Sequence, residues 1–367
     1  MKREHKMTDV KRHILDRSRP HFSNSRHLIL AVSELCNHRC VYCYVSSSHL
    51  ENRSVIPVAK LIEHFIALRE SLNVNLVTLV GGEPSLLHDF EEVVRCIRYT
   101  GLDLIVQSNG SLRPDQIAVL KEVEVRYVSV SLDSTLTATN DALRFSGATN
   151  LAQVCIRRCV ESNLPVRISC VVTRSNLGHI PALVKYAEES GVDLINLHYV
   201  DTIQNPSLLR NVALSAEEWL SAWNTWKQLA SDSTVLIRAP IVYLPNILAA
   251  QLANAGVACP ARQSDTINMT PDERLFRCPL LMAIDKPSWY HSSDIKCSEP
   301  LDDMVLMPVS SRSGSCPVLA RRQDEIDSAD YVRVCPMVKS TLNTSNGTRN
   351  PLWDQVIGLT DERESLI

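Results

Sequence analysis

The chain has 367 residues, which is enough for one large domain or two ordinary ones. Its hydrophobic fraction of 45% allows a full-sized core, and a formal net charge of −3 gives no global sign of binding to nucleic acid or to an acidic membrane surface. No apolar run approaches the ~20 residues of a membrane span. We therefore expect a cytoplasmic protein with no nucleic-acid partner and no membrane partner.

The first 26 residues are locally basic, with eight Lys or Arg against three Asp or Glu. They lack the apolar stretch of a secretory signal. We expect residues 1–26 to form a solvated arm, and a substrate-binding or targeting arm is the alternative.

Residues 27 to about 200 alternate between short β-branched runs and helical patterns. This order is typical of a parallel sheet with helices outside it, and near-continuous apolar strands fit a sheet buried on both faces. Six such units predict an α/β fold, either an open doubly wound sheet or a partial barrel. The expected strands are 28–35, 76–81, 103–108, 127–132, 166–173 and 194–200, and the expected helices are 57–72, 87–99, 113–122, 149–162 and 179–190.

After residue 200 the alternation stops. Residues 214–230 form a clear helix, in which Ser215 and Glu218 make a capping box. Its three tryptophans share one face, which predicts an aromatic surface packed between two parts of the molecule. They are Trp219, Trp223 and Trp226.

The composition divides the chain into five parts. A segment near the end is rich in Cys, Pro and Ser. This composition indicates a small, loop-rich domain that is stabilised by cross-links such as bound metal rather than by a large core of its own. We expect a basic arm (1–26), an α/β core (27–212), a helical connector (213–254), the Cys-rich domain (255–340) and a C-terminal tail (341–367).

Twelve cysteines are many for a chain without an export signal, and a reducing compartment disfavours disulfides. Grouped cysteines therefore indicate metal or redox chemistry. Isolated cysteines inside strand-like or helix-like segments are expected to be buried packing thiols. The isolated ones are Cys96, Cys155, Cys159 and Cys170.

Polar motifs follow the first four expected strands, where each strand ends. A cysteine triplet comes first, and "GGEP", "QSNG" and "SLDS" follow in chain order. Because the carboxyl ends of parallel strands meet at one edge, where ligands bind in such folds, the motifs predict a common site.

The triplet consists of Cys36, Cys40 and Cys43 on a loop. A zinc site needs a fourth ligand, and none is local. An iron–sulfur cube held by three thiolates leaves one iron open to a small molecule.

The stretch "CNHRCVYC", residues 36–43, resembles the CxxxCxΦC motif of radical S-adenosylmethionine (radical SAM) enzymes, with Tyr42 at the aromatic position. The resemblance covers roughly residues 27 to 200. It implies a partial (β/α)6 barrel in which Cys36, Cys40 and Cys43 hold a 4Fe–4S cluster, and S-adenosylmethionine chelates the open iron.

The resemblance also implies an activity. A reductant such as flavodoxin or ferredoxin supplies an electron, and S-adenosylmethionine is cleaved reductively to a 5′-deoxyadenosyl radical. This radical abstracts a hydrogen atom from the substrate, while the protein orients the reactants and excludes water and oxygen.

"GGEP" consists of Gly81, Gly82, Glu83 and Pro84. The chain has only 11 glycines, so an adjacent pair at a strand end is informative. Glycines let a backbone approach a ligand closely, and Glu83 supplies an acceptor. A plain turn is the alternative. By resemblance, the motif binds the methionyl amino group of the cofactor.

The next two motifs offer hydrogen-bonding groups that suit ribose hydroxyls or a ligand amine. By resemblance they contact the ribose and methionine parts of the cofactor, and a turn or N-cap role for Asp133 is the alternative. These residues are Ser108, Asn109, Ser131 and Asp133.

Three further residues are assigned by resemblance alone. Arg144 matches the position whose guanidinium grips the cofactor carboxylate, and a surface salt bridge is the alternative. Val172 and His198, with the neighbouring Tyr199, are expected to contact adenine.

Five cysteines follow residue 255, and four of them precede a proline, a recurring feature of iron–sulfur loops. They predict a four-thiolate site, with zinc or scattered packing thiols as alternatives. The four are Cys259, Cys278, Cys316 and Cys335, and Cys297 is the fifth cysteine.

This segment resembles the SPASM or shorter "twitch" extensions of radical SAM enzymes, in which a β-hairpin separates two ligand cysteines. Cys259 and Cys278 flank such a segment, although Asp272 and Glu273 stand at the turn where the extensions have glycine. The close spacings of a full SPASM domain are missing, so one auxiliary 4Fe–4S cluster is expected.

The expected function is substrate oxidation or bond formation, by dehydrogenation or cross-linking, in specialised metabolite or peptide biosynthesis. An epimerase with Cys297 as hydrogen donor is the alternative, and a non-enzymatic zinc- or cluster-binding regulatory protein is a remote one. Only 35 residues precede Cys36, too few for a leader-peptide recognition domain, which shifts the expectation toward a small molecule or a peptide recognised otherwise.

Overall fold

A computed structural model describes most of the first two thirds of the chain and short pieces of the rest. The late cysteines, Cys259, Cys278, Cys297, Cys316 and Cys335, lie outside the described residues. The described residues are 26–43, 56–202, 206–240, 242–245, 266–276, 290–291, 331–333 and 339–341.

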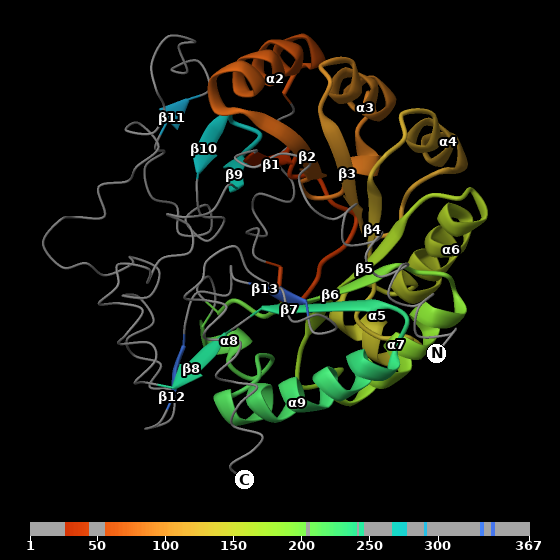
Figure 1. Cartoon of the computed structure of the whole chain (residues 1–367), viewed down its shortest axis with the longest axis vertical. Coiled ribbons are helices and arrows are strands. Elements are labelled where there is room, and N and C mark those ends of the chain that lie inside the picture. Colours follow the sequence, from red (N-terminus) through yellow and green to blue (C-terminus); the bar gives the residue numbers. More distant parts are fainter. Residues whose placement is uncertain are drawn as a thin grey trace, which may run out of the picture.

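The centre of the molecule is a curved parallel sheet in which strands β1 to β7 lie side by side in chain order (Figure 1). Every neighbouring pair is parallel, and the register shifts once, between Arg26 and His27 in the pairing of β1 with β2. The strands are β1 (Arg26–Ala31), β2 (Val74–Val80), β3 (Asp103–Ser108), β4 (Tyr127–Ser131), β5 (Val166–Val172), β6 (Leu194–Tyr199) and β7 (Leu236–Pro240).

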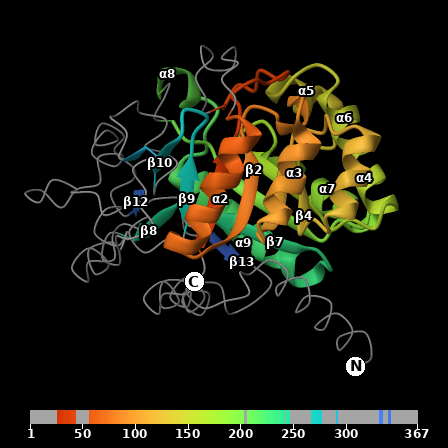
Figure 2. The same cartoon turned by 90° about the horizontal axis from the view of Figure 1, so that it is seen from above.

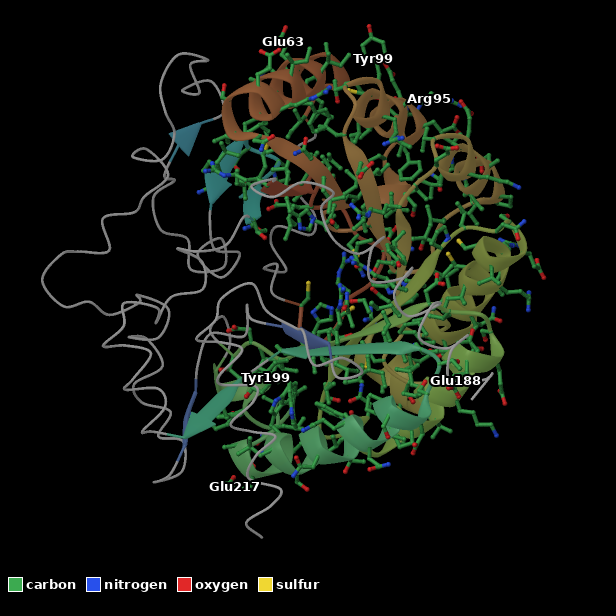
Figure 3. The ribbon with its side chains drawn as sticks, viewed as in Figure 1. Glu63, Arg95, Tyr99, Glu188, Tyr199 and Glu217 are labelled. Carbon is green, nitrogen blue, oxygen red and sulfur yellow. The ribbon has the colours of Figure 1, made fainter. Side chains whose placement is uncertain are left out.

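Helices cover the outer, convex side of this sheet, and Figure 2 shows α2 and α3 side by side on it. Figure 3 shows Glu63 and Arg95 pointing outward from these two helices. The helices are α2 (Val58–Leu72), α3 (Phe90–Tyr99), α4 (Pro114–Glu122), α5 (Thr137–Leu143), α6 (Ala148–Glu161), α7 (Ile180–Glu189), α8 (Pro206–Leu209) and α9 (Ala216–Asp232), with 3₁₀ turns η1 (Pro84–Leu86) and η2 (Leu177–His179).

The expected α/β partial barrel is confirmed, and the expected elements lie within a few residues of the observed ones. The four isolated cysteines are buried thiols, as expected. Among the described helices, none is long and apolar enough to cross a membrane.

Two elements differ from the expectation. The sheet has a seventh parallel strand, β7, which α9 connects to β6, so the strand–helix alternation continues beyond residue 200. The short helix α5 also lies in a stretch to which we assigned no element. The expected domain boundaries stay a prediction.

Helix α9 begins with the predicted capping box, because the Glu218 amide donates to Ser215 Oγ (3.2 Å) and the Ser215 amide donates to Glu218 Oε2 (2.6 Å). Trp219 and Trp226 are buried and meet edge to face, with ring centroids 5.1 Å apart. Trp219 also packs on Tyr199 of β6, so the aromatic face closes the gap between α9 and the sheet.

The two faces of the sheet differ in chemistry. On the helix side, residues such as Val128, Val130 and Ile168 belong to one continuous apolar core. Near the amino ends of the strands, the concave side carries a thin apolar layer. This layer, the barrel floor, consists of Leu76, Ile105, Tyr127, Leu194 and Leu236.

Further strands extend the sheet at both edges. The expected hairpin before residue 278 is present, because β9 pairs antiparallel with β10 and parallel with β1. The other edge strand, β13, pairs antiparallel with β7, and β8 pairs with β12 in a separate ribbon. These strands are β8 (Tyr243–Pro245), β9 (Thr266–Met269), β10 (Arg274–Phe276), β11 (Tyr290–His291), β12 (Tyr331–Arg333) and β13 (Lys339–Thr341).

The turn of the β9–β10 hairpin has a non-glycine residue, Glu273, in a backbone conformation that favours glycine. Glu273 adopts a left-handed backbone conformation with φ of 66°. Its carboxylate meets Lys60 Nζ (2.9 Å) and His64 Nε2 (3.0 Å), both on α2. These contacts fix the hairpin against the barrel and offset the backbone strain.

The helix-side core predicts a contrast between neighbours on α2. Phe65 is fully buried in this core, whereas Ile66 is 43% exposed. We expect Phe65→Ala to lower the free energy of unfolding by about 3–5 kcal/mol and Ile66→Ala to change it by less than about 0.5 kcal/mol. Urea unfolding measures both, and equal losses in the two variants would contradict the assigned packing.

Candidate functional site

The cysteine loop begins where β1 runs on past its last strand residue and stays paired with the end of β2. The Gly82 amide donates to the Ser33 carbonyl (2.8 Å), and the Glu83 amide donates to the Leu35 carbonyl (2.8 Å). This pairing holds the residues directly before Cys36 against the "GGEP" turn.

The two glycines are required by this close approach. A Cβ on Gly81 would lie 2.2 Å from the Ser33 carbonyl oxygen, and a Cβ on Gly82 would lie 2.1 Å from that of Leu35. We expected the pair to make room for a ligand. In the structure it makes room for the backbone that leads into the cysteine loop.

Glu83, expected as an acceptor for the cofactor, is 2% exposed and has partners within the chain. It accepts hydrogen bonds from Ser108 Oγ (2.8 Å), the Asn109 amide (2.6 Å) and the Ser85 amide (3.2 Å). Burial raises the pKa of this carboxyl, against the effect of the hydrogen bonds. Glu83 thus ties the end of β2 to the end of β3, and Pro84 beside it starts η1.

Asn109 extends this connection to the cysteine loop. Its Nδ2 donates to Asn37 Oδ1 (2.7 Å) and lies 4.0 Å from Cys36 Sγ. Asn37 Nδ2 in turn donates to Ser111 Oγ (3.0 Å). Asn37 and Ser111 were missed from the sequence, because only the fold brings their two loops together.

Asp133 anchors the loop from the other side. It is fully buried and forms a two-pronged ion pair with Arg144, from Nε (2.6 Å) and Nη2 (3.0 Å). The Val171 amide (2.8 Å) and the Tyr42 hydroxyl also donate to it. The carboxylate therefore joins the loop, β5 and the segment after α5.

Arg144 was expected to grip the cofactor carboxylate, with a surface salt bridge as the alternative. The structure shows a buried pair, with the guanidinium 5.7 Å from the centre of the Tyr42 ring. Burial disfavours the charge, but Asp133 outweighs this effect and raises the pKa of Arg144.

Helix α5 supplies backbone acceptors for the loop. The Val41 amide donates to the Leu143 carbonyl (2.9 Å), and the Arg39 amide donates to the Arg144 carbonyl (3.3 Å). The last carbonyls of a helix have no partners within it, so they can accept such bonds. His38, in the same loop, stacks on Phe145 with ring centroids 5.5 Å apart.

The three thiols of the loop are half-buried. Burial raises the pKa of Cys36, and it raises the pKa of Cys40 to about 12. Thiolates at these positions therefore need a positive partner, which metal ions supply.

The arrangement of the donors fits a cluster better than a single ion. Within the described residues, no three His, Cys, Asp or Glu side chains come close enough to hold one metal ion together. The charge of Cys43 raises the pKa of both Cys36 and Cys40, and the charge of Cys36 also raises the pKa of Cys40, so the three thiols lie near one another. An iron–sulfur cluster, which gives each thiolate its own iron, suits three thiols placed in this way.

Two of the expected residues face the concave side of the sheet, and two do not. Ser131 Oγ accepts from Gln107 Nε2 (3.1 Å), and His198 Nε2 lies 3.0 Å from Ser169 Oγ. Val172 lies in the helix-side core, so the residue of β5 that faces the interior is Val171. Tyr199, which is labelled in Figure 3, packs on Trp219 on the helix side. Its hydroxyl lies 3.0 Å from Tyr243 Oη.

Residues 30–187 match the family model of the Radical SAM superfamily. Among curated proteins, the chain is 30% identical over 187 residues to the Fe-coproporphyrin III synthase of Methanosarcina barkeri, across 50% of this chain and 46% of that protein. It is 25% identical over 223 residues to the GTP 3′,8-cyclase of Synechococcus elongatus, across 58% and 68%. The chain thus spans about half the length of the first relative.

Solved structures share the fold at low sequence identity. SuiB of Streptococcus suis bound to S-adenosylmethionine superposes with a TM-score of 0.64 and 14% identity, covering 81% of this chain and 72% of that one. The protein anSMEcpe with bound AdoMet gives 0.59 and 16%, covering 77% and 82%. These likenesses concern the fold alone.

The close approach at "GGEP" predicts that Gly82 tolerates no side chain. We expect Gly82→Ala to lower the free energy of unfolding by at least about 1–3 kcal/mol, because the added Cβ would clash with the backbone carbonyls of Glu34 and Leu35, directly before the cysteine loop. Gly178→Ala is the matched control, since nothing lies within 4 Å of a Cβ there. Urea unfolding measures both, and a Gly82→Ala protein as stable as the control would contradict the assignment.

The Asp133–Arg144 pair predicts a large loss when one partner is removed. Asp133→Ala leaves a buried guanidinium without its carboxylate, so we expect a loss of about 3–5 kcal/mol. Asp115→Ala, which breaks an exposed pair with Arg113, should leave the melting temperature unchanged. Similar melting temperatures for the two variants would refute the anchoring role of Asp133.

Proposed function

The chain carries a Radical SAM superfamily domain over residues 30–187, and from this premise we propose that it is an oxidoreductase-type radical SAM enzyme. In this proposal Cys36, Cys40 and Cys43 hold a 4Fe–4S cluster that binds S-adenosylmethionine. When bound, the two cofactors supply one-electron cleavage of S-adenosylmethionine and removal of a hydrogen atom from the substrate.

The observation that carries this proposal is the double anchoring of a loop with three thiols. Glu83 and Asn109 fix the Cys36 side of the loop, and Asp133 with Arg144 fixes the Tyr42 side. A set of thiols held at both ends is preorganised, which is what a cluster with an open coordination position requires.

The side chains proposed to contact S-adenosylmethionine are those that stay on the concave side near this loop. Ser131 and His198 meet that condition. The contacts of Glu83, Asp133 and Arg144 support a different role for these three, in which they position the cysteine loop.

We also propose one auxiliary 4Fe–4S cluster on Cys259, Cys278, Cys316 and Cys335. Support comes from the β9–β10 hairpin between the first two of these cysteines, which Glu273 fixes to α2. An auxiliary cluster suits dehydrogenation or cross-linking, because it can accept an electron from the substrate. Epimerisation with Cys297 as hydrogen donor stays the alternative.

The comparisons support two substrate classes. SuiB has been solved with the precursor peptide SuiA, and anSMEcpe with a peptide. The curated relatives are named for small molecules, GTP and Fe-coproporphyrin III. We propose a small-molecule or peptide substrate, a flavodoxin or ferredoxin as reductant, and a cytoplasmic location.

Counting iron in a set of cysteine variants tests both clusters. After anaerobic reconstitution we expect about eight irons in the wild type and about four when Cys36, Cys40 and Cys43 are all replaced by Ala. The wild type should form 5′-deoxyadenosine from S-adenosylmethionine on reduction, and the triple variant should not.

Cys96→Ala is the control, because Cys96 is a buried packing thiol on α3, and it should keep the wild-type iron content. Zinc in place of iron, or no 5′-deoxyadenosine from the wild type, would refute the proposed function. About four irons in the wild type and none in the triple variant would remove only the auxiliary cluster.

A further inference from the structure

The concave face of the sheet carries polar residues at the level of the barrel floor and directly above it, toward the cysteine loop. In β4, Val128 and Val130 belong to the helix-side core, so Ser129 between them faces the interior. The same alternation places Arg167 of β5 and Asn196 of β6 on the interior face.

These interior residues lie on adjacent strands. Ser129 is the register partner of Arg167, and Asn196 is the register partner of Arg238 on β7. Arg167 is also the register partner of the floor residue Leu194, which lies two residues before Asn196 on β6. Register partners on adjacent strands lie about 4.8 Å apart and share a face. We call Ser129, Arg167, Asn196 and Arg238 the polar layer.

Three atoms of this layer are buried without a hydrogen-bond partner in the described part of the chain. They are Ser129 Oγ, Arg167 Nε and Asn196 Oδ1. Ser129 is 0% exposed and Asn196 is 6% exposed. Buried polar groups in folded proteins are nearly always satisfied, so three neighbouring exceptions call for a common partner.

The layer is positively charged. Burial, followed by the nearby charge of Arg238, lowers the pKa of Arg167 to about 10, so the guanidinium stays charged at neutral pH. Arg167 has no acidic partner among the described residues. Asp103, a carboxylate on β3, pairs with Arg98 and Arg126 instead.

The charge of Arg167 also affects His27 on β1. Burial lowers the pKa of His27 to about 3, with further lowering by Arg167 and Arg126. The ring is therefore neutral at pH 7, and its Nε2 lies 2.7 Å from Thr78 Oγ1. His27 adds no charge that could balance Arg167.

We propose that the polar layer binds an oxyanion of the substrate, so that the substrate carries a carboxylate or phosphate group. A guanidinium binds two oxygens of such a group in one plane, and the Ser129 hydroxyl donates to a third position. This inference rests on the proposed function and specifies the substrate class of that site.

The layer also indicates which group of the substrate lies next to the oxyanion. Asn196 Oδ1 is an acceptor, so the ligand should offer an N–H or O–H beside its anionic group. Amino acids, hydroxy acids and sugar phosphates share this chemistry.

The position of the layer orients the substrate toward the cofactor. Ser131 and His198 follow Ser129 and Asn196 by two residues on the same face, a step of roughly 7 Å toward the cysteine loop. An anionic group held in the layer leaves the rest of the substrate pointing at the proposed cofactor.

Calorimetric titration of the reconstituted protein, with S-adenosylmethionine present, tests the proposal. The probes are inorganic phosphate and acetate, at an ionic strength held constant with chloride. We expect saturable binding of at least one probe to the wild type, weakened at least about tenfold by Arg167→Gln. Arg157→Gln is the matched control, because it removes the same charge from the exposed outer side of α6 and should bind like the wild type.

Ser129→Ala guards against a folding defect in Arg167→Gln. This change removes an unpartnered buried hydroxyl, so we expect an equal or higher melting temperature together with weaker binding of the probe. A lower melting temperature would show that the hydroxyl already has a partner and would count against the proposal.

Each outcome of the titration is decisive. Binding of phosphate alone indicates a phosphorylated substrate, acetate alone indicates a carboxylate, and both support an oxyanion site in general. No saturable binding to the wild type, or equal binding by wild type, Arg167→Gln and Ser129→Ala, overturns the proposal. Formation of 5′-deoxyadenosine by the wild type is measured separately, so failure of the proposed function is distinguished from failure of the anion site.

Discussion

The arrangement of the site depends on one buried carboxylate, that of Asp133. It meets Arg144, the Tyr42 hydroxyl and the Val171 amide, so three separate segments converge on two oxygens. A buried ion pair contributes little net stability, because desolvating the charges costs about as much as their attraction returns. Its value here is geometric, since a misplaced loop would leave a charge buried without its partner.

Glu83 is a second buried carboxylate that holds the cysteine loop, on the side opposite Asp133. Together the two carboxylates explain why the cysteine loop needs no helix or strand of its own. One joins β2 to β3, and the other joins β4 to β5. Each sits where a strand ends and a backbone amide lacks a strand partner. Buried hydrogen bonds thus connect the rim of the barrel, although it is built from loops.

Much of the fold could be predicted from the sequence, because strand and helix patterns are local. The cysteine spacing and "GGEP" were equally local, so their place on one rim followed from the order of the strands. The roles of Glu83 and Arg144 were less accessible. Their partners, Asn109 and Asp133, become neighbours only in the folded chain, and a carboxylate that binds a ligand has the same sequence pattern as one that binds the protein.

The elements missed from the sequence have physical reasons. Helix α5 has seven residues, fewer than an isolated helix needs, and its N-cap residue Leu136 makes no side-chain cap. Strand β7 has five residues and ends in Pro240, so it resembles a loop until β6 and β13 pair with it. In both cases tertiary contacts decide a structure that local propensity leaves open.

The strands also carry an alternation of polar and apolar residues that distinguishes their two faces. Near-continuous apolar runs suggested burial on both faces, yet "YVSVS" in β4 alternates strictly between valine and serine beyond its first residue. Arg167 and Asn196 interrupt β5 and β6 on the same face. The helix side of the sheet can therefore supply the stability, while the concave side accommodates buried polar groups without a hydrogen-bond partner among the described residues. Substrate specificity in such a barrel is best sought in the polar residues that interrupt its strands.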